Sequence, residues 1–343
     1  MGGLSRRFVK INEMRENGID PLIVDAGDLF FSTKRLTVSN KKSEIFRAGA
    51  ILEGYGKIGC DAINVGHYEM LNGLSFLKEM EDKTDIPFLS ANLRDATSNS
   101  LLFEPFRIVE KGSLKIGIIG VTDKLPDTSR TMIADDYILA GNEYINQLSK
   151  QTDIIVMLVN ADQSTYSDLP THFENADFIV TSGSTNLTRN NNQQKKNGPY
   201  LYSCGKQGKF LSVLTVSMND SDEAVVDVSS HETKIKSIHK RFERLQKKDV
   251  NKSLEDIYAN QENVLKLIRQ YREDLIISES AIAEAVNTIK YETISLNKKI
   301  KDNPELLSFV NKSLATCNSL SPKIKAPSKS VKTPSIKMNK RIK

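Results

Sequence analysis

The sequence lacks several features, and each absence excludes a class of protein. It contains no tryptophan, and only 3 of its 343 residues are cysteine. These cysteines are far apart, form no CxxC pair and indicate no disulfide framework. The 4 histidines are also scattered, without an HxH or HxxxH arrangement. The sequence therefore predicts neither a disulfide-rich fold nor a metal site built from one short motif.

Long apolar segments are also absent. No apolar run reaches about 18 residues, so we expect no membrane span. The first residues, MGGLSRRFVKINEMREN, contain no apolar stretch typical of an export signal. If synthesis starts at Met1, we expect the chain to stay in the cytoplasm.

The net charge of +5 is concentrated at one end of the chain. No acid follows Glu305, whereas nine Lys and Arg do, and subtracting these nine leaves −4 for the rest. A basic segment on a mildly acidic body is not by itself a nucleic-acid-binding domain, and we expect no nucleic-acid partner. Residues 304–343 also hold four of the ten prolines, so we predict a disordered Lys/Pro/Ser-rich tail there.

Residues 1–231 alternate strand and helix patterns. Short runs rich in Val and Ile are bounded by turns, which indicates buried strands in layers with helices outside. The segments FRIVEKGSLKIGIIGVT and YLYSCGKQGKFLSVLTVSM each predict a hairpin. Four strands end in polar residues, at Asp28, His67, Asn160 and Ser184. In layered α/β folds ligands gather at such strand ends, so we expect a site there.

Residues 232–303 differ in character, since no Gly or Pro occurs between Gly208 and Pro304. Between residues 254 and 300 mostly apolar side chains follow a seven-residue repeat, with a break expected near residues 278–280. This spacing predicts long helices forming a coiled coil or a helical hairpin, with a possible homodimer through residues 254–300. A helix lying on the α/β body is the alternative.

Five segments in order resemble a known family: GGLSRR, LIVDAGDLFF, INVGHYEMLNG, FLSANL and FEPFRIVEKGSLKIGIIGVT. Together they are similar to metallophosphoesterases of the 5′-nucleotidase and UDP-sugar hydrolase type, over about residues 2–220. The resemblance implies a four-layer α-β-β-α sandwich with the site at the strand ends. It also implies phosphate-ester hydrolysis, a phosphate or nucleotide ligand, and an exported or periplasmic location.

The resemblance further implies two divalent metals (Mn, Mg or Zn) that clamp a phosphate and activate water. Gly27-Asp28 matches the family's Gly-Asp element, so Asp28 takes the position of the bridging metal ligand. His67 stands where the family has an Asn ligand. The family's Asp-x-His strand is expected just upstream of Gly2, where this chain begins.

The remaining ligand positions hold neutral residues. Asn160 stands where a His is expected, and Ser184 and Asn186 occupy the two His positions of the last element. Hydroxyl and amide oxygens substitute poorly for imidazole on transition metals. We therefore assign these three residues to substrate binding and expect no stable two-metal centre.

Tyr68 and Glu69 are the candidate catalytic residues. Tyr68 stands where a His would help to protonate the leaving group. The ordinary pKa of tyrosine is about 10 and that of histidine about 6.5, so proton transfer near neutral pH is weakened. Tyr68 keeps a hydroxyl that can donate to a phosphate oxygen.

The stretch FVNKSLATCNSLSPKIKAPSKS resembles the start of a cytochrome-type extension found in some relatives. A CxxCH motif would fall on residues 314–318, where only Cys317 is present and the histidine position holds Asn318. We therefore expect no haem.

Three hypotheses follow. The chain is a degenerate phosphoesterase with weak or no hydrolysis, that is, a pseudoenzyme. Alternatively, it is a structural or interaction protein that oligomerises through its helical arm. In the third, an upstream segment supplies the missing ligands and the activity is kept.

Overall fold

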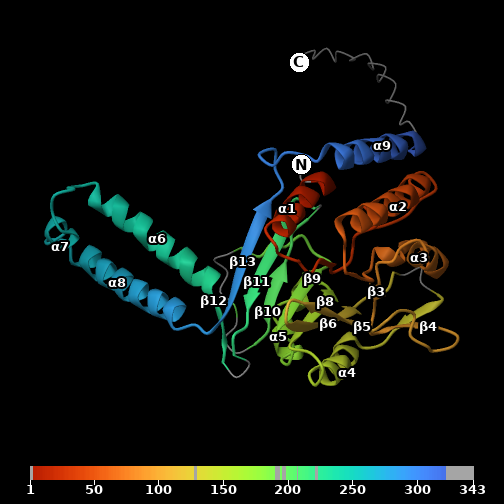
Figure 1. Cartoon of the computed structure of the whole chain (residues 1–343), viewed down its shortest axis with the longest axis horizontal. Helices are drawn as coiled ribbons and strands as arrows, with labels where there is room; N and C mark the ends of the chain where they lie inside the picture. The colour runs from red at the N-terminus through yellow and green to blue at the C-terminus, as the bar shows by residue number, and fades with distance from the viewer. Residues whose placement is uncertain are drawn as a thin grey trace, which may run out of the picture.

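The computed structural model describes residues 3–126, 130–189, 194, 198–206, 208–220 and 223–321 (Figure 1). The strands of the two central sheets, in chain order, are β1 (Val24–Asp25), β2 (Ala62–Asn64), β3 (Phe88–Leu89), β5 (Phe106–Lys111), β6 (Leu114–Thr122), β8 (Ile154–Asn160), β9 (Phe178–Ser182) and β10 (Tyr200–Ser203). One sheet has the order β1-β2-β3 and is parallel. The other has the order β10-β9-β8-β6-β5, and only β5 is antiparallel to its neighbour. The carboxyl ends of the parallel strands lie along a common edge of each sheet. In layered α/β folds this edge is where ligands bind.

Helices cover the outer faces of both sheets. In chain order they are α1 (Leu4–Glu16), α2 (Lys41–Ile58), α3 (Leu74–Glu81), α4 (Tyr137–Leu148) and α5 (Leu169–His172), with short 3-10 turns η1 (Glu69–Asn72) and η2 (Gln163–Thr165). One buried cluster, including Leu52 and Ile63, joins α2 to the first sheet. A second, including Leu89 and Ile118, fills the space between the sheets, and a third, including Ile145, joins α4 to the second sheet. The chain has a mixed α/β fold.

The hairpin predictions have different outcomes. β5 and β6 form the predicted hairpin, with Lys111 opposite Leu114 across the turn. The second hairpin prediction is wrong, because β10 pairs with β9, and β11 (Phe210–Ser217) pairs with a strand from much later in the chain. A two-stranded sheet of β4 (Leu93–Asp95) and β7 (Met132–Ala134) completes this part of the described structure.

A helical hairpin projects from the body, as one of the predicted alternatives states (Figure 1). It consists of α6 (Val228–Gln246), the short α7 (Leu254–Ile257) and α8 (Glu262–Ala283). Ile268 is buried in its interior, and the rings of Phe242 and Tyr271 meet with centroids 6.0 Å apart. The turn lies at residues 247–261, so the predicted break near residues 278–280 is wrong. The structure places Ser278, buried, inside α8.

The prediction of helix up to residue 300 is also wrong. Residues Asn287–Ser295 form β13, which lies between β11 and β12 (Val225–Asp227) in a third sheet. Eight residue pairs join β13 to β11 in antiparallel register. The segment NTIKYETIS alternates buried and more exposed side chains, with Ile289 and Tyr291 inside. Period-two alternation with β-branched residues is a strand pattern, which the seven-residue repeat had obscured.

The predicted disordered tail begins with an ordered helix, α9 (Pro304–Leu320). The Asn303 side chain caps it by accepting a hydrogen bond from Leu306 N at 2.9 Å, and Pro304 occupies the first turn. The Ser5 hydroxyl donates to Asn303 O and the Ser43 hydroxyl to Cys317 O, which ties α9 to α1 and α2. Residues 322–343 of the predicted tail lie outside the described residues.

Both β13 and α9 return to the body, so residues 232–303 do not form one continuous helical arm. The division of the chain into three domains, residues 1–231, 232–303 and 304–343, stays a prediction. Among the described residues, no helix combines the length and the apolar character that a membrane span needs.

Candidate functional site

The carboxyl end of β1 leads directly into Asp28. Gly27 has φ 101°, and a Cβ there would lie 2.9 Å from Asn64 O and from Gly66 N, so only glycine fits. Asp28 itself has φ 62°, a strained left-handed conformation for a residue with a side chain. Its Oδ1 accepts a hydrogen bond from Tyr68 N at 2.9 Å. Burial raises the pKa of Asp28, and the Tyr68 N–H partly opposes this rise.

Glu69 anchors the loop that follows β2. It is fully buried, and its two carboxylate oxygens accept backbone N–H groups. The donors are Asp28 at 2.8 Å, Leu29 at 2.5 Å, Phe30 at 3.0 Å and Gly66 at 2.9 Å. Burial raises the pKa of Glu69 to about 7, and the Asp28 carboxylate adds to the rise. Because its oxygens already accept these four N–H groups, Glu69 holds the two loops together. It is not exposed to act on a substrate.

His67 and Tyr68 stand half-buried beside Asp28. Their rings lie with centroids 5.7 Å apart at an angle of 57°. The charge of His67 contributes to lowering the pKa of Asp28, and the Tyr68 N–H donates to the same carboxylate. Burial, followed by the Asp28 carboxylate, raises the pKa of the Tyr68 hydroxyl above 10. The geometry therefore brings Asp28, His67 and Tyr68 together, with a tyrosine even weaker as an acid than the sequence implied.

Asn160, at the end of β8, is buried between the loop after β2 and the end of β9. Its Oδ1 accepts from His67 N at 2.9 Å, and its Nδ2 donates to Ser182 Oγ at 2.7 Å. The Ser182 hydroxyl in turn donates to Ala26 O at 2.6 Å. Asn160 is 2% exposed, so little of it is open to a substrate. Ser182 ends β9, and sequence analysis missed it by choosing Ser184.

The other two predicted binding residues lie further along the loop after β9. The Ser184 hydroxyl accepts from Asn186 N at 3.1 Å, and the side chain of Asn186 is exposed. In the described part of the chain, no hydrogen bond joins either side chain to Asp28.

Asp123 links the end of β6 to the loop after β8. It follows β6, and its charge contributes to raising the pKa of Asp28, which places the two carboxylates near each other. Its Oδ2 accepts from Asp162 N at 3.2 Å, and its own N–H donates to Asn160 O at 2.9 Å. These contacts are those of a residue that caps a turn.

The donor groups at the strand ends do not fit a two-metal centre. Among the described residues, no group of three or more His, Cys, Asp or Glu side chains could hold a metal ion. The amide oxygen of Asn160 is occupied by an N–H, and one oxygen of Asp28 by another. Neutral amide and hydroxyl groups already engaged within the protein are poor ligands for Mn or Zn.

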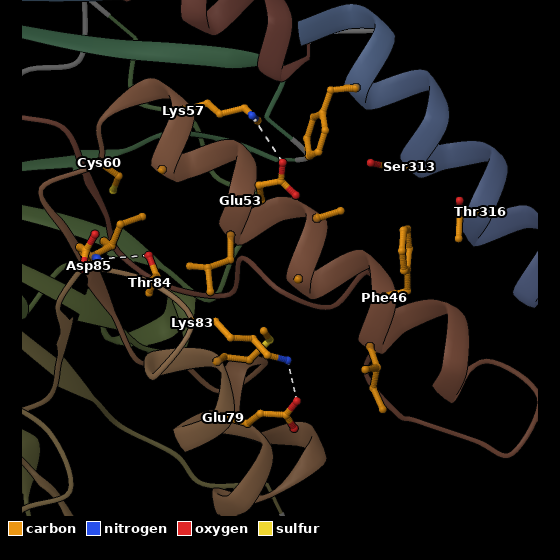
Figure 2. A pocket seen from close by; sticks show the side chains of 18 of the residues that line it. Phe46, Glu53, Lys57, Cys60, Glu79, Lys83, Thr84, Asp85, Ser313 and Thr316 are labelled. Carbon is orange, nitrogen blue, oxygen red and sulfur yellow. Dashed lines mark hydrogen bonds and ion pairs between the residues drawn. The ribbon is translucent and has the colours of Figure 1, made fainter.

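A separate hollow of about 1120 Å³ lies between α2, α3 and α9 (Figure 2). The charges on its rim pair with each other, Lys57 with Glu53 at 3.4 Å and Lys83 with Glu79 at 2.6 Å. Cys60 lies at one end, and burial raises the pKa of its thiol. The described lining contains no histidine and includes none of Asp28, His67 and Tyr68, so the hollow is separate from the candidate site.

No family model matches the sequence. A snake venom 5′-nucleotidase from Gloydius brevicauda is 34% identical over 128 residues, which are 36% of this chain and 21% of that protein. A 5′-nucleotidase from Vibrio cholerae is 28% identical over 160 residues, 46% of this chain and 27% of its own length. The chain thus spans about a quarter of the length of these curated relatives.

Solved structures extend the comparison to the fold. The calcineurin-like phosphoesterase YfkN from Bacillus subtilis has a TM-score of 0.59 at 18% identity, covering 93% of this chain and 90% of its own. A 5′-nucleotidase precursor from Thermus thermophilus has a TM-score of 0.53 at 20% identity, covering 64% of this chain and 46% of its own. The chain is a distant member of the 5′-nucleotidase / calcineurin-like metallophosphoesterase family.

Proposed function

We propose that this chain is a 5′-nucleotidase-type phosphoesterase domain that binds a phosphate ester at its strand ends and hydrolyses it weakly or not at all. The proposal includes the family's four-layer α-β-β-α sandwich as the scaffold. One observation carries it: Asp28, His67 and Tyr68 meet at the strand ends, while Asn160 is engaged by the protein itself.

The proposed ligand is a nucleoside monophosphate or another phosphate ester. Tyr68 is the residue that we expect to contact it, because the residue is half-buried and its hydroxyl can donate to a phosphate oxygen. Protonation of a leaving group by this hydroxyl is unfavourable, since burial and Asp28 hold its pKa above 10. In relatives a divalent metal supplies charge stabilisation and an activated water. The residues of this chain do not fit that centre, so we assign no step to it.

Phosphate release from AMP tests the proposal directly. The full chain is assayed with Mn, Mg or Zn added in turn, beside a no-protein blank, and AMP binding is measured by calorimetry. We expect release near the blank and binding that weakens about tenfold in Tyr68→Phe, which corresponds to the loss of one hydrogen bond of about 1.4 kcal/mol. Ser149→Ala, at the exposed end of α4, serves as the control.

Metal-dependent turnover at rates of about 1 s⁻¹ or more, typical of enzymes, would contradict the weak-hydrolysis part of the proposal. Absence of AMP binding would contradict the binding part. These two outcomes are measured on the same protein sample and are independent of each other.

A second candidate function is self-association through the arm. On α8, Ile276 is 63% exposed and Ile277 is 60% exposed, and Leu267 is 40% exposed. A two-helix hairpin has no third helix to cover such side chains. This observation favours a homodimer through residues 262–283, because the rest of the predicted segment 254–300 includes β13, which belongs to a sheet.

Light scattering after size exclusion tests the association. The full chain is compared with the double variant Ile276→Glu/Ile277→Glu and with Lys236→Glu, an exposed change on α6. We expect the double variant to be monomeric and the Lys236 variant to match the wild type. A monomeric wild type, or an unchanged mass in the double variant, would refute the dimer.

A further inference from the structure

Polar side chains join the two central sheets at their carboxyl ends. Ser182, from the second sheet, donates to Ala26 O just after β1 at 2.6 Å. Asn160, also from the second sheet, accepts from His67 N in the loop after β2 at 2.9 Å. Asn160 Nδ2 donates to Ser182 Oγ at 2.7 Å, which links these two bridges. A continuous chain of hydrogen bonds therefore connects the ends of β1, β2, β8 and β9.

Two further side chains reinforce the same edge. Asn64, the last residue of β2, donates to Ala26 O and to Val121 O, each at 3.0 Å. The Thr122 hydroxyl, at the end of β6, donates to Val65 O after β2. Both residues are fully buried. Side-chain hydrogen bonds thus cross between the sheets at every strand that borders the candidate site.

The backbone is packed tightly around this network. A Cβ on Gly66 would lie 2.8 Å from Asp28 N, 2.9 Å from Asn160 Nδ2 and 2.9 Å from Glu69 Oε2. The amide of Asn160 also hydrogen-bonds the Asp28 carboxylate and lowers its pKa. The Asn160 amide, the Ser182 hydroxyl and the Glu69 carboxylate at the strand ends are therefore hydrogen-bonded within the protein.

We infer that the hydrogen-bond network of Asn160 and Ser182 is a built-in crosslink that holds the strand ends together without a metal ion. The inference rests on the proposed function in one respect, the misfit of the donors to a two-metal centre. A divalent cation at Asn160 Oδ1 or at Asp28 Oδ1 would share that oxygen with the His67 N–H or the Tyr68 N–H. Sharing the acceptor with a cation weakens the N–H hydrogen bond, which is unfavourable in a buried site.

Thermal unfolding of the full chain tests the crosslink. The wild type is measured after EDTA treatment and after addition of Mn or Zn, and we expect Tm to stay within about 1 °C, since no native ligand set gains or loses an ion. Asn160→Ala is expected to lower Tm by about 5–10 °C, because it breaks two buried hydrogen bonds in a domain of this size. Ser149→Ala, whose hydroxyl donates only to Asn146 O in the same helix end, should leave Tm within about 1 °C.

Ser182→Ala is the milder variant in case Asn160→Ala does not fold. It should lower Tm by about half as much, and the double variant should lose less than the sum of the single changes, because the two side chains act as one unit. An EDTA-induced fall in Tm, a rise of several degrees with Mn or Zn, or strict additivity would overturn the inference.

The readout separates this inference from the proposed function. Metal-dependent AMP hydrolysis together with a Tm that ignores EDTA would refute the proposed function and leave the crosslink standing. Absent hydrolysis together with a Tm that falls in EDTA would refute the crosslink and leave the weak-hydrolysis proposal standing.

Discussion

The strand ends bury polar side chains, whereas the helical arm exposes apolar side chains to solvent. At the strand ends Glu69 is 0% exposed and Asn160 is 2% exposed, and each has its polar atoms engaged by named partners. On the arm, Ile276 and Ile277 are more than half exposed, and apolar surface is left uncovered. The contrast indicates that the strand ends are closely packed, whereas the arm has apolar surface to offer another molecule.

The backbone is also packed more tightly at the strand ends than on the outer helix α2. Around the candidate site, backbone atoms approach so closely that Gly27 and Gly66 have no room for a Cβ. In α2, by contrast, a Cβ on Gly56 would meet nothing within 4 Å. Substitutions should therefore be costly at the strand ends and tolerated on the outer helices, and three predictions measure this difference.

The largest effect is expected from Gly66→Ala. The new methyl group would stand under 3.0 Å from Asp28 N and from two side chains of the network, so the backbone must move. We expect a loss of about 3 kcal/mol or more in the free energy of unfolding, measured by urea denaturation. Gly56→Ala is the matched control and should be neutral or stabilising by up to about 1 kcal/mol. Equal losses at both glycines would remove the contrast between the two regions.

An intermediate effect is expected from Glu69→Gln. Glutamine offers one acceptor oxygen and turns an NH₂ group toward the backbone N–H groups that Glu69 now binds. We expect a loss of about 2 kcal/mol at neutral pH, measured by urea denaturation.

The same variant tests a pH dependence. Burial raises the pKa of Glu69 from 4.5 to about 7, so the folded state holds a proton that the unfolded state releases between these values. The free energy of unfolding should therefore fall as pH rises from 4.5 to 7, and the slope should be shallower in Glu69→Gln. Glu79→Gln, at an exposed ion pair, should keep the wild-type slope. An unchanged slope in Glu69→Gln would show that Glu69 does not titrate in this range.

The smallest effect is expected on the arm. Lys234 on α6 pairs with Asp274 on α8 at 2.8 Å, and the lysine side chain is 45% exposed. Because water screens such pairs, Lys234→Ala should cost about 0.5 kcal/mol or less, and less still at about 1 M salt. Lys236→Ala, on the same helix and in no ion pair among the described residues, is the control. A loss above about 2 kcal/mol, well outside the range for exposed pairs, would mean that the arm is as tightly coupled as the body.

Much of the site could be predicted because its signals are local. The Gly-Asp and Gly-His-Tyr-Glu turns follow buried strands, and the structure brings Asp28, His67 and Tyr68 together. Ser182 was missed, because a serine at a strand exit looks the same in the sequence whether it caps a turn or faces the site. Only the pairing of the sheets distinguishes these cases.

The C-terminal third of the chain shows where sequence reasoning failed. The seven-residue repeat ran through residues 287–295, yet this segment pairs with β11 over eight residues and forms β13. The sequence does show the period-two alternation of a strand, with Ile289 and Tyr291 on one face. Over a short stretch, however, this period and the helical period of three to four residues place apolar side chains at overlapping positions. The α9 helix had an Asn303 cap and a following proline, signals that the basic composition beyond it concealed.

The sequence by itself determined the alternating strand and helix elements, the helical hairpin and the polar residues at the strand ends, because these follow from hydrophobic period and turn chemistry. Only the tertiary structure decided that β13 and α9 return to the body, that Glu69 serves the backbone, and that Asn160 and Ser182 bind each other. The physical reason is that each of these outcomes depends on a partner distant in the chain. Burial makes such a partner obligatory, but nothing in the local sequence identifies it.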